Sequence, residues 1–249
     1  MRESCEASWK PAWPAASPIL EFNQDAARRI ESHLIDGPAG KIESLLEEPE
    51  GREPVEACLV AHPHPLFGGT MHNKVVYRIA RGMRRAGAVV MRFNFRGVSR
   101  SEGTHDQGIG EVEDARAALE FLRERYPGLP YSLAGFSFGS RVILKLGCSL
   151  PAPWPLRLIA AGFPTKRSKV DYLAHCPLPK FFVQSTKDEH GPREELEAAF
   201  QYFADPKKLE FIEAGDHFFA GALEELEETI AHIPGTEDQL TERLRESST

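Results

Sequence analysis

Apolar and polar residues follow two repeating patterns along most of this chain. Short apolar runs of strand length occur at 55–62, 88–95, 131–136, 156–163, 180–185 and 208–214. Most are followed by a stretch in which apolar residues recur every three or four positions, the period of one helical face. The predicted helices cover 73–87, 107–125 and 138–148, and two more lie around 196–203 and 223–230. This alternation predicts an α/β fold, a mostly parallel sheet with helices on both faces.

The N-terminal part departs from this pattern. Residues 31–36 and 41–48 predict an antiparallel edge strand or hairpin. Residues 1–28 hold three prolines and no continuous apolar run, which argues against a signal peptide and predicts a flexible tail. We therefore expect residues 29–249 to form a single domain, because a chain of 249 residues suits one large α/β unit.

Composition narrows the classes of function. A hydrophobic content of 41% allows a sizeable core, and a net charge of −7 argues against a nucleic-acid-binding surface. No apolar stretch is long enough to span a membrane. The four cysteines show no C-x-x-C spacing, and Cys58 and Cys148 lie in apolar runs typical of buried thiols. This usage predicts no disulfide framework and favours a reducing, cytoplasmic compartment.

Candidate chemistry gathers where the predicted strands end, because such sheets carry their reactive groups at the carboxyl ends of the strands. The run "GFSFGS" (135–140) places Ser137 at a turn from a strand into a helix. Glycines at 135 and 139 suit a sharp turn in which helix and strand approach closely. Ser137 is therefore the candidate nucleophile. The amide of Phe138, at the start of the helix, is a candidate donor to an oxyanion.

A serine hydroxyl needs a base that accepts its proton. His217 follows the last predicted strand, in "GDHFF" (215–219), and Asp188 follows the strand before it, in "TKDEHG" (186–191). Asp188 would fix the tautomer of His217 and stabilise the imidazolium. Glu189 is a rival for this role because it is one residue away, whereas Asp216, adjacent to His217, ranks below Asp188.

Five motifs carry a resemblance to a known family: "HPHPLFGGTMHNKVV" (62–76), "NFRGVSRSEGTHDQGIGE" (94–111), "GFSFGS", "KDEHGP" and "GDHFF". Over residues 36–232 the chain resembles a small bacterial α/β-hydrolase family of the dienelactone-hydrolase-like type. The resemblance implies the α/β-hydrolase fold and its triad order, here Ser137, Asp188, His217. Dienelactone hydrolases themselves use a cysteine where this chain has Ser137. The family usually reads R-G-V-G-x-S, and Ser99 stands here in place of the second glycine.

The second oxyanion donor is expected in the loop after the strand 55–62. Pro63 and Pro65 have no N–H, which leaves His64 and Leu66 as donors, and the resemblance favours His64. His62, His64 and His72 also raise the possibility of a zinc site. Their spacing lacks a matching carboxylate or a known ligand register, so no metal and no other cofactor is expected. We expect His62 to support the loop by hydrogen bonding.

The sequence thus predicts a serine hydrolase that cleaves small or short-chain carboxylic esters through an acyl-enzyme. The short segment between Ser137 and Asp188 leaves no room for a large cap domain, so the site is expected to be open. The expected partner is a small-molecule ester substrate, and neither nucleic acid nor a membrane is expected to bind. The protein itself is expected to be a monomer or a homodimer. Two alternatives remain: a thioesterase or peptidase using the same triad, and a non-catalytic hydrolase-fold module that binds a partner.

Overall fold

The structure is a computed structural model that describes residues 29–167 and 170–235. The predicted N-terminal tail, 1–28, lies outside these residues. Among the described residues, eight strands form one sheet in the order β1-β2-β4-β3-β5-β6-β7-β8. Their bounds are β1 Ile30–Gly37, β2 Gly40–Glu47, β3 Glu56–Ala61, β4 Ala88–Phe93, β5 Tyr131–Phe136, β6 Leu158–Ala161, β7 Lys180–Ser185 and β8 Lys207–Ile212.

The predicted antiparallel edge is confirmed. Strands β1 and β2 pair as a hairpin in which Gly37 lies opposite Gly40, and β2 runs antiparallel to β4. All remaining neighbours in the sheet are parallel. The carboxyl ends of six parallel strands, β3 to β8, therefore meet at one edge of the sheet, where the sequence places the candidate chemistry.

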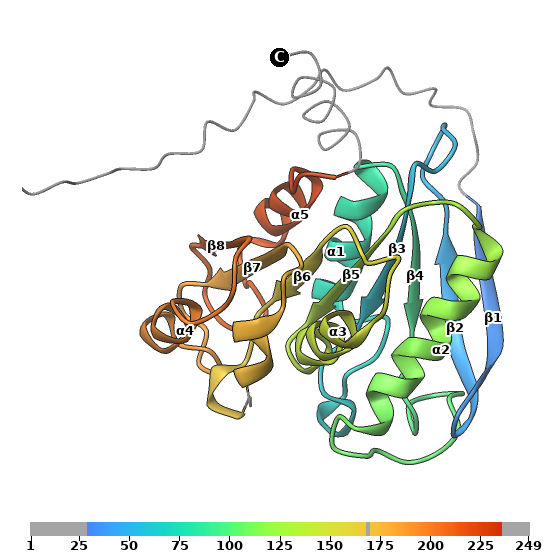
Figure 1. Cartoon of the computed structure of the whole chain (residues 1–249), viewed down its shortest axis with the longest axis horizontal. Helices are drawn as coiled ribbons and strands as arrows, with labels where there is room; N and C mark the ends of the chain where they lie inside the picture. The colour runs from blue at the N-terminus through green and yellow to red at the C-terminus, as the bar shows by residue number, and fades with distance from the viewer. Residues whose placement is uncertain (1–28, 168–169, 236–249) are drawn as a thin grey trace, which may run out of the picture.

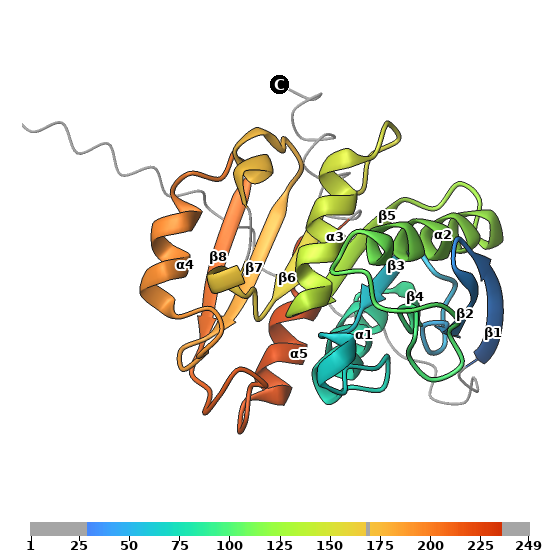
Figure 2. The same cartoon turned by 90° about the horizontal axis from the view of Figure 1, so that it is seen from below.

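Helices cover both faces of the sheet (Figures 1 and 2). Helices α1 (Lys74–Arg85) and α5 (Leu223–Ala231) pack on one face, and α2 (Gly110–Arg125), α3 (Phe138–Ser149) and α4 (Arg193–Phe200) pack on the other. Strand β3 shows why its sequence is apolar throughout. Leu59 points into the core beneath α2 and α3, whereas its neighbours Cys58 and Val60 point into the core beneath α1 and α5. No helix in the described ranges is long and apolar enough to cross a membrane.

Several predicted elements are shorter in the structure, among them one helix and one strand. The helix expected over 107–125 begins at Gly110, because Gln107 and Gly108 adopt positive φ angles of 52° and 87° that a helix cannot contain. The strand expected over 88–95 ends at Phe93. Between Ser137 and Asp188 lie only α3, β6, β7 and two short 3₁₀ turns, η2 (Thr165–Arg167) and η3 (Asp171–His175), in the described part of this segment. The described residues thus contain no large cap domain there.

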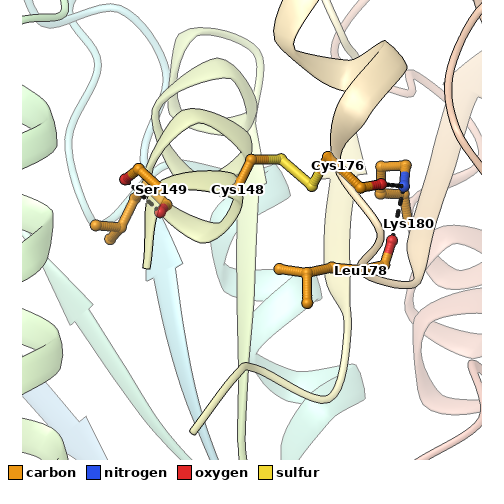
Figure 3. Close-up of a disulfide and its surroundings, with 6 residues drawn as sticks. Cys148, Ser149, Cys176, Leu178 and Lys180 are labelled. Carbon is orange, nitrogen blue, oxygen red and sulfur yellow. Dashed lines mark hydrogen bonds between the residues drawn. A yellow bond between two sulfur atoms is a disulfide. The ribbon is translucent and has the colours of Figure 1, made fainter. Parts of the chain in front are cut away.

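A disulfide joins α3 to the segment that follows η3, which the sequence analysis did not expect (Figure 3). Cys148, at the end of α3, bonds to Cys176, 28 residues later. Lys180 is fully buried beside this bond and its ammonium donates to the carbonyls of Cys176 and Leu178, at 2.6 Å and 2.7 Å. The prediction that cysteine usage excludes a disulfide is therefore wrong for this pair, and the inference of a reducing compartment loses its basis. Cys58 is a buried free thiol, as expected.

Candidate active site

Ser137 occupies a tight turn between β5 and α3. Its backbone angles, φ 54° and ψ −119°, are rare for a residue with a side chain. Hydrogen bonds hold this conformation: the Ser137 amide donates to the Ala161 carbonyl at 2.9 Å, and the Ser140 hydroxyl donates to the Ser137 carbonyl at 2.6 Å. The residues on either side, Phe136 and Phe138, are buried, whereas Ser137 itself is partly exposed. The turn therefore presents the serine side chain at the edge of the sheet.

The two glycines of the motif are required by close backbone contacts. A Cβ on Gly135 would lie 2.5 Å from the carbonyl carbon and oxygen of Gly139. A Cβ on Gly139 would lie 2.4 Å from the carbonyl oxygen of Ala61, at the end of β3. Both distances are far shorter than real Cβ contacts, so the start of α3 reaches the end of β3 only with glycine at these positions. This approach brings the loop after β3 next to Phe138.

Asp188 and His217 form a buried pair. The Nδ1 of His217 lies 2.7 Å from Oδ2 of Asp188, and the two side chains are 2% and 0% exposed. A carboxylate accepts only, so the proton of the neutral imidazole sits on Nδ1 and the lone pair on Nε2. The sequence places these residues after β7 and β8, and the structure brings them together as predicted.

The carboxylate of Asp188 is held on both oxygens. Oδ1 accepts from the backbone amides of His190 and Gly191, at 2.8 Å and 3.0 Å, and Oδ2 accepts from Nε2 of Gln184 at 2.8 Å as well as from His217. Hydrogen bonds of this kind fix the orientation of the carboxylate.

The two rival carboxylates bind backbone instead of the imidazole. Glu189 accepts from the backbone amide of His217 at 3.2 Å. Asp216 accepts from the amides of Phe218 and Ala220, at 2.8 Å and 3.0 Å, and so stabilises its own turn. The geometry thus separates Asp188 from both alternatives.

His217 lies beside the Ser137 turn. Its ring stacks on that of Phe136, the residue before Ser137, with ring centroids 4.8 Å apart. A Cβ on Gly162 would lie 2.6 Å from the Phe136 ring and 3.1 Å from Cε1 of His217. Gly162 directly follows Ala161, whose carbonyl binds the Ser137 amide. The imidazole, the serine turn and the end of β6 therefore occupy one small region.

The candidate oxyanion donors also lie close together. Phe138 is the first residue of α3, so its N–H has no acceptor within the helix. Its ring is 5.0 Å from the ring of His64, in the loop after β3. The amide of Leu66 donates to Nδ1 of His64 at 3.2 Å. Of the two donors left open by the sequence, Leu66 is thus engaged by its own loop, and His64 stays the donor predicted from the resemblance.

His62 has the supporting role that the sequence predicts. The ring is fully buried; Nδ1 lies 2.6 Å from the Pro63 carbonyl, and Nε2 accepts from the Phe95 amide at 3.0 Å. Burial lowers the pKa of His62 to about 4, so the ring is neutral near pH 7. Both nitrogens therefore bind backbone groups and tie the loop after β3 to the loop after β4.

Ser99, which stands in place of the family's glycine, has a backbone conformation that favours glycine. Its φ of 52° lies in the left-handed region, which serine occupies less readily than glycine. The Ser99 side chain hydrogen-bonds to the Glu43 carboxylate, which also accepts from Asn94 at 2.8 Å and from the Arg100 amide at 3.2 Å. The Ser99 side chain thus links the loop after β4 to strand β2 by a hydrogen bond that glycine could not make.

Gln184 is a residue of the candidate site that the sequence analysis missed. It is buried within β7, four residues before Asp188. Besides donating to Asp188, its side chain binds the Gly191 carbonyl and both backbone groups of Phe163. The signal was present, because a glutamine inside the apolar run "KFFVQS" needs buried polar partners.

Comparisons with known proteins agree on one family. A family profile for the alpha/beta hydrolase domain matches residues 56–241. A protein of Rickettsia prowazekii is 34% identical over 202 residues, covering 78% of this chain and 84% of that protein. The structure of an alpha-beta serine hydrolase homologue from Coxiella burnetii aligns with a TM-score of 0.76 and 36% identity, over 81% of this chain and 95% of that one. A lidless a/b serine hydrolase from Xanthomonas campestris aligns with a TM-score of 0.76 and 31% identity, over 83% and 96%.

Proposed function

This chain belongs to the alpha/beta hydrolase family, and we propose that it is a serine hydrolase that cleaves small carboxylic esters through an acyl-enzyme. The observation that carries the proposal is the contact of 2.7 Å between Asp188 and His217, buried beside the strained turn of Ser137. Nucleophile, base and orienting acid are the three parts that such a reaction needs.

In the first half of the reaction, the Ser137 hydroxyl attacks the ester carbonyl and its proton passes to Nε2 of His217. The carbonyl electron pair moves to the oxygen, which the amides of Phe138 and His64 stabilise. Collapse of this intermediate expels the alcohol, which takes the proton from His217, and leaves the acyl group on Ser137.

In the second half, water attacks the acyl group and gives a proton to His217. The second intermediate releases the carboxylic acid, and the proton returns to Ser137. Asp188 stays ionised throughout and stabilises the imidazolium that forms in each half. Three of its hydrogen bonds, from Gln184, His190 and Gly191, hold the carboxylate in position, and the fourth joins it directly to the imidazole.

The absence of a large cap among the described residues between α3 and β7 supports an open site and small substrates. We expect p-nitrophenyl acetate and butyrate to be hydrolysed, and kcat/KM to fall once the acyl chain passes medium length. Ser137→Ala is the matched control and should abolish turnover of every ester. A preference for long acyl chains would contradict the open-site argument. A folded wild-type protein that turns over no ester would favour a binding module instead.

A further inference from the structure

Four aromatic rings form a continuous surface beside Ser137, which we call the aromatic wall: His64, Phe67, His105 and Phe138. The ring of His64 is at its centre, with centroids 4.7 Å from Phe67, 4.9 Å from His105 and 5.0 Å from Phe138. His105 and Phe138 are themselves 5.7 Å apart. The rings come from three separate segments: the loop after β3, the loop after β4 and the first turn of α3. Two of them, His64 and Phe138, carry the proposed oxyanion donors.

The aromatic wall runs from the core to the solvent. Phe138 is 4% exposed and packs on Phe95 in the core, whereas Phe67 is 76% exposed. Leu66 and Ile109, which flank the same loops, are also largely exposed, at 69% and 66%. Large apolar side chains gathered in the open are uncommon on a protein surface and mark a place where something apolar binds.

The loop that carries His105 is held by a buried carboxylate. Glu111, fully buried at the start of α2, accepts from the amides of Asp106 and Gly108, at 2.8 Å and 2.7 Å. Its Oε1 also lies 2.7 Å from Nδ1 of His105, a close contact without hydrogen-bond geometry. The loop that carries His105 is therefore held rigidly against the wall, so a ligand would find this surface already formed.

The aromatic wall and His217 belong to opposite sides of the serine. Phe138 is part of the core beneath α2 and α3, whereas Phe136, on which His217 stacks, is part of the core beneath α1 and α5. In the proposed reaction His217 returns its proton to the leaving alcohol, so the alcohol lies on the His217 side. The acyl group then extends the other way, along the aromatic wall.

We propose that the aromatic wall is the acyl subsite, that the substrates are esters of aromatic carboxylic acids, and that Phe67 determines this specificity. A planar aromatic ring can stack on the rings of His64 and Phe67, whereas a saturated ring of the same size gains only from the burial of its apolar surface. This inference rests on the proposed function, since it names the substrate class of the same site.

The test compares p-nitrophenyl benzoate with p-nitrophenyl cyclohexanecarboxylate, which share a leaving group and differ mainly in planarity. Each kcat/KM is divided by the rate constant for hydroxide-catalysed hydrolysis, which removes the difference in intrinsic reactivity. We expect the wild-type protein to favour the benzoate about 2- to 13-fold, the range of an aromatic pair. Phe67→Leu keeps an apolar side chain, removes the ring, and should bring the ratio close to one.

The matched control is Phe218→Leu, the same change on a ring that contacts His217 at 5.4 Å, on the alcohol side. It should alter both rates in the same proportion. Equal rates in the wild-type protein, an unchanged ratio in Phe67→Leu, or a lost ratio in Phe218→Leu would each overturn the assignment of the acyl subsite. Turnover of p-nitrophenyl acetate with no preference refutes this inference alone. A protein that hydrolyses no ester refutes the proposed function as well.

Discussion

Replacing Gln184 with leucine tests how the site is held together. The side chain lies fully buried in β7 and makes four hydrogen bonds. It donates to Asp188 at 2.8 Å, to the Gly191 carbonyl at 2.9 Å and to the Phe163 carbonyl at 3.3 Å, and it accepts from the Phe163 amide at 2.8 Å. Leucine has a similar volume and fills the same space, so the change removes the polar contacts and little else.

The expected cost follows from the groups left without a partner. Gln184→Leu leaves the buried Phe163 amide and the Gly191 carbonyl without hydrogen-bond partners, at a cost of about 1–3 kcal/mol each. The free energy of unfolding should therefore fall by about 2–6 kcal/mol. Asp188 keeps its two backbone donors on Oδ1 but loses one of two partners on Oδ2. Its carboxylate is then free to turn away from His217, and we expect kcat to fall about 10- to 100-fold, with KM little changed.

Urea unfolding and the kinetics of p-nitrophenyl acetate hydrolysis measure these two effects. Gln201→Leu is the matched control, because Gln201 is an exposed glutamine that follows α4, and it should change neither quantity. Gln184→Glu keeps an acceptor for the Phe163 amide but sets a second carboxylate beside Asp188, so it should lose at least as much activity as the leucine variant. An unfolding free energy within about 0.5 kcal/mol of the wild type, together with an unchanged kcat, would refute the reasoning.

Three further outcomes are expected. Gly139→Ala should lower stability by about 1–3 kcal/mol and slow fluorophosphonate labelling, because its Cβ would lie 2.4 Å from the Ala61 carbonyl oxygen; an unchanged melting temperature and labelling rate would contradict this. The pKa of His62, about 4, lies below the usual histidine value of about 6.5, so between these pH values only the unfolded chain takes up the proton. The free energy of unfolding should therefore fall by about 3 kcal/mol as pH drops from about 6.5 to 4. An NMR titration of His62 with a midpoint near the usual value would refute this. Reductant should destabilise the wild type by about 3–4 kcal/mol, since the Cys148–Cys176 bond closes 28 residues, and leave Cys148→Ser unaffected; equal sensitivity would contradict the bond.

The order of the strands and helices could be predicted because the spacing of apolar residues along the chain matches the geometry of each element. The run at β3 is apolar on both faces because both faces are buried, and the edge hairpin expected from 31–36 and 41–48 is the pairing of β1 with β2. The comparisons confirm the α/β-hydrolase fold and the alpha/beta hydrolase family. The serine turn could be located because the close contact between helix and strand requires glycine at two positions near the serine, and this pattern is visible in the local sequence.

Long-range contacts are what the sequence did not reveal. Gln184 reads as one polar residue in an apolar strand, and its partners in two other loops become evident only once β6 and β7 are paired. Cys148 and Cys176 have no spacing signal, because they meet only after the chain has passed through β6 and η3. The aromatic wall could not be predicted for the same reason, since its rings come from two loops and the first turn of α3, which meet at the edge of the sheet.

The most direct measurement is labelling with a fluorophosphonate, followed by mapping of the modified peptide by mass spectrometry. The phosphorus traps only a serine that a neighbouring base has activated. The account predicts one label per chain, on Ser137, absent in Ser137→Ala and formed about 1,000-fold or more slowly in His217→Ala. A folded wild-type protein that takes up no label, or takes it up at another residue, would contradict the claim that His217 and Asp188 activate Ser137.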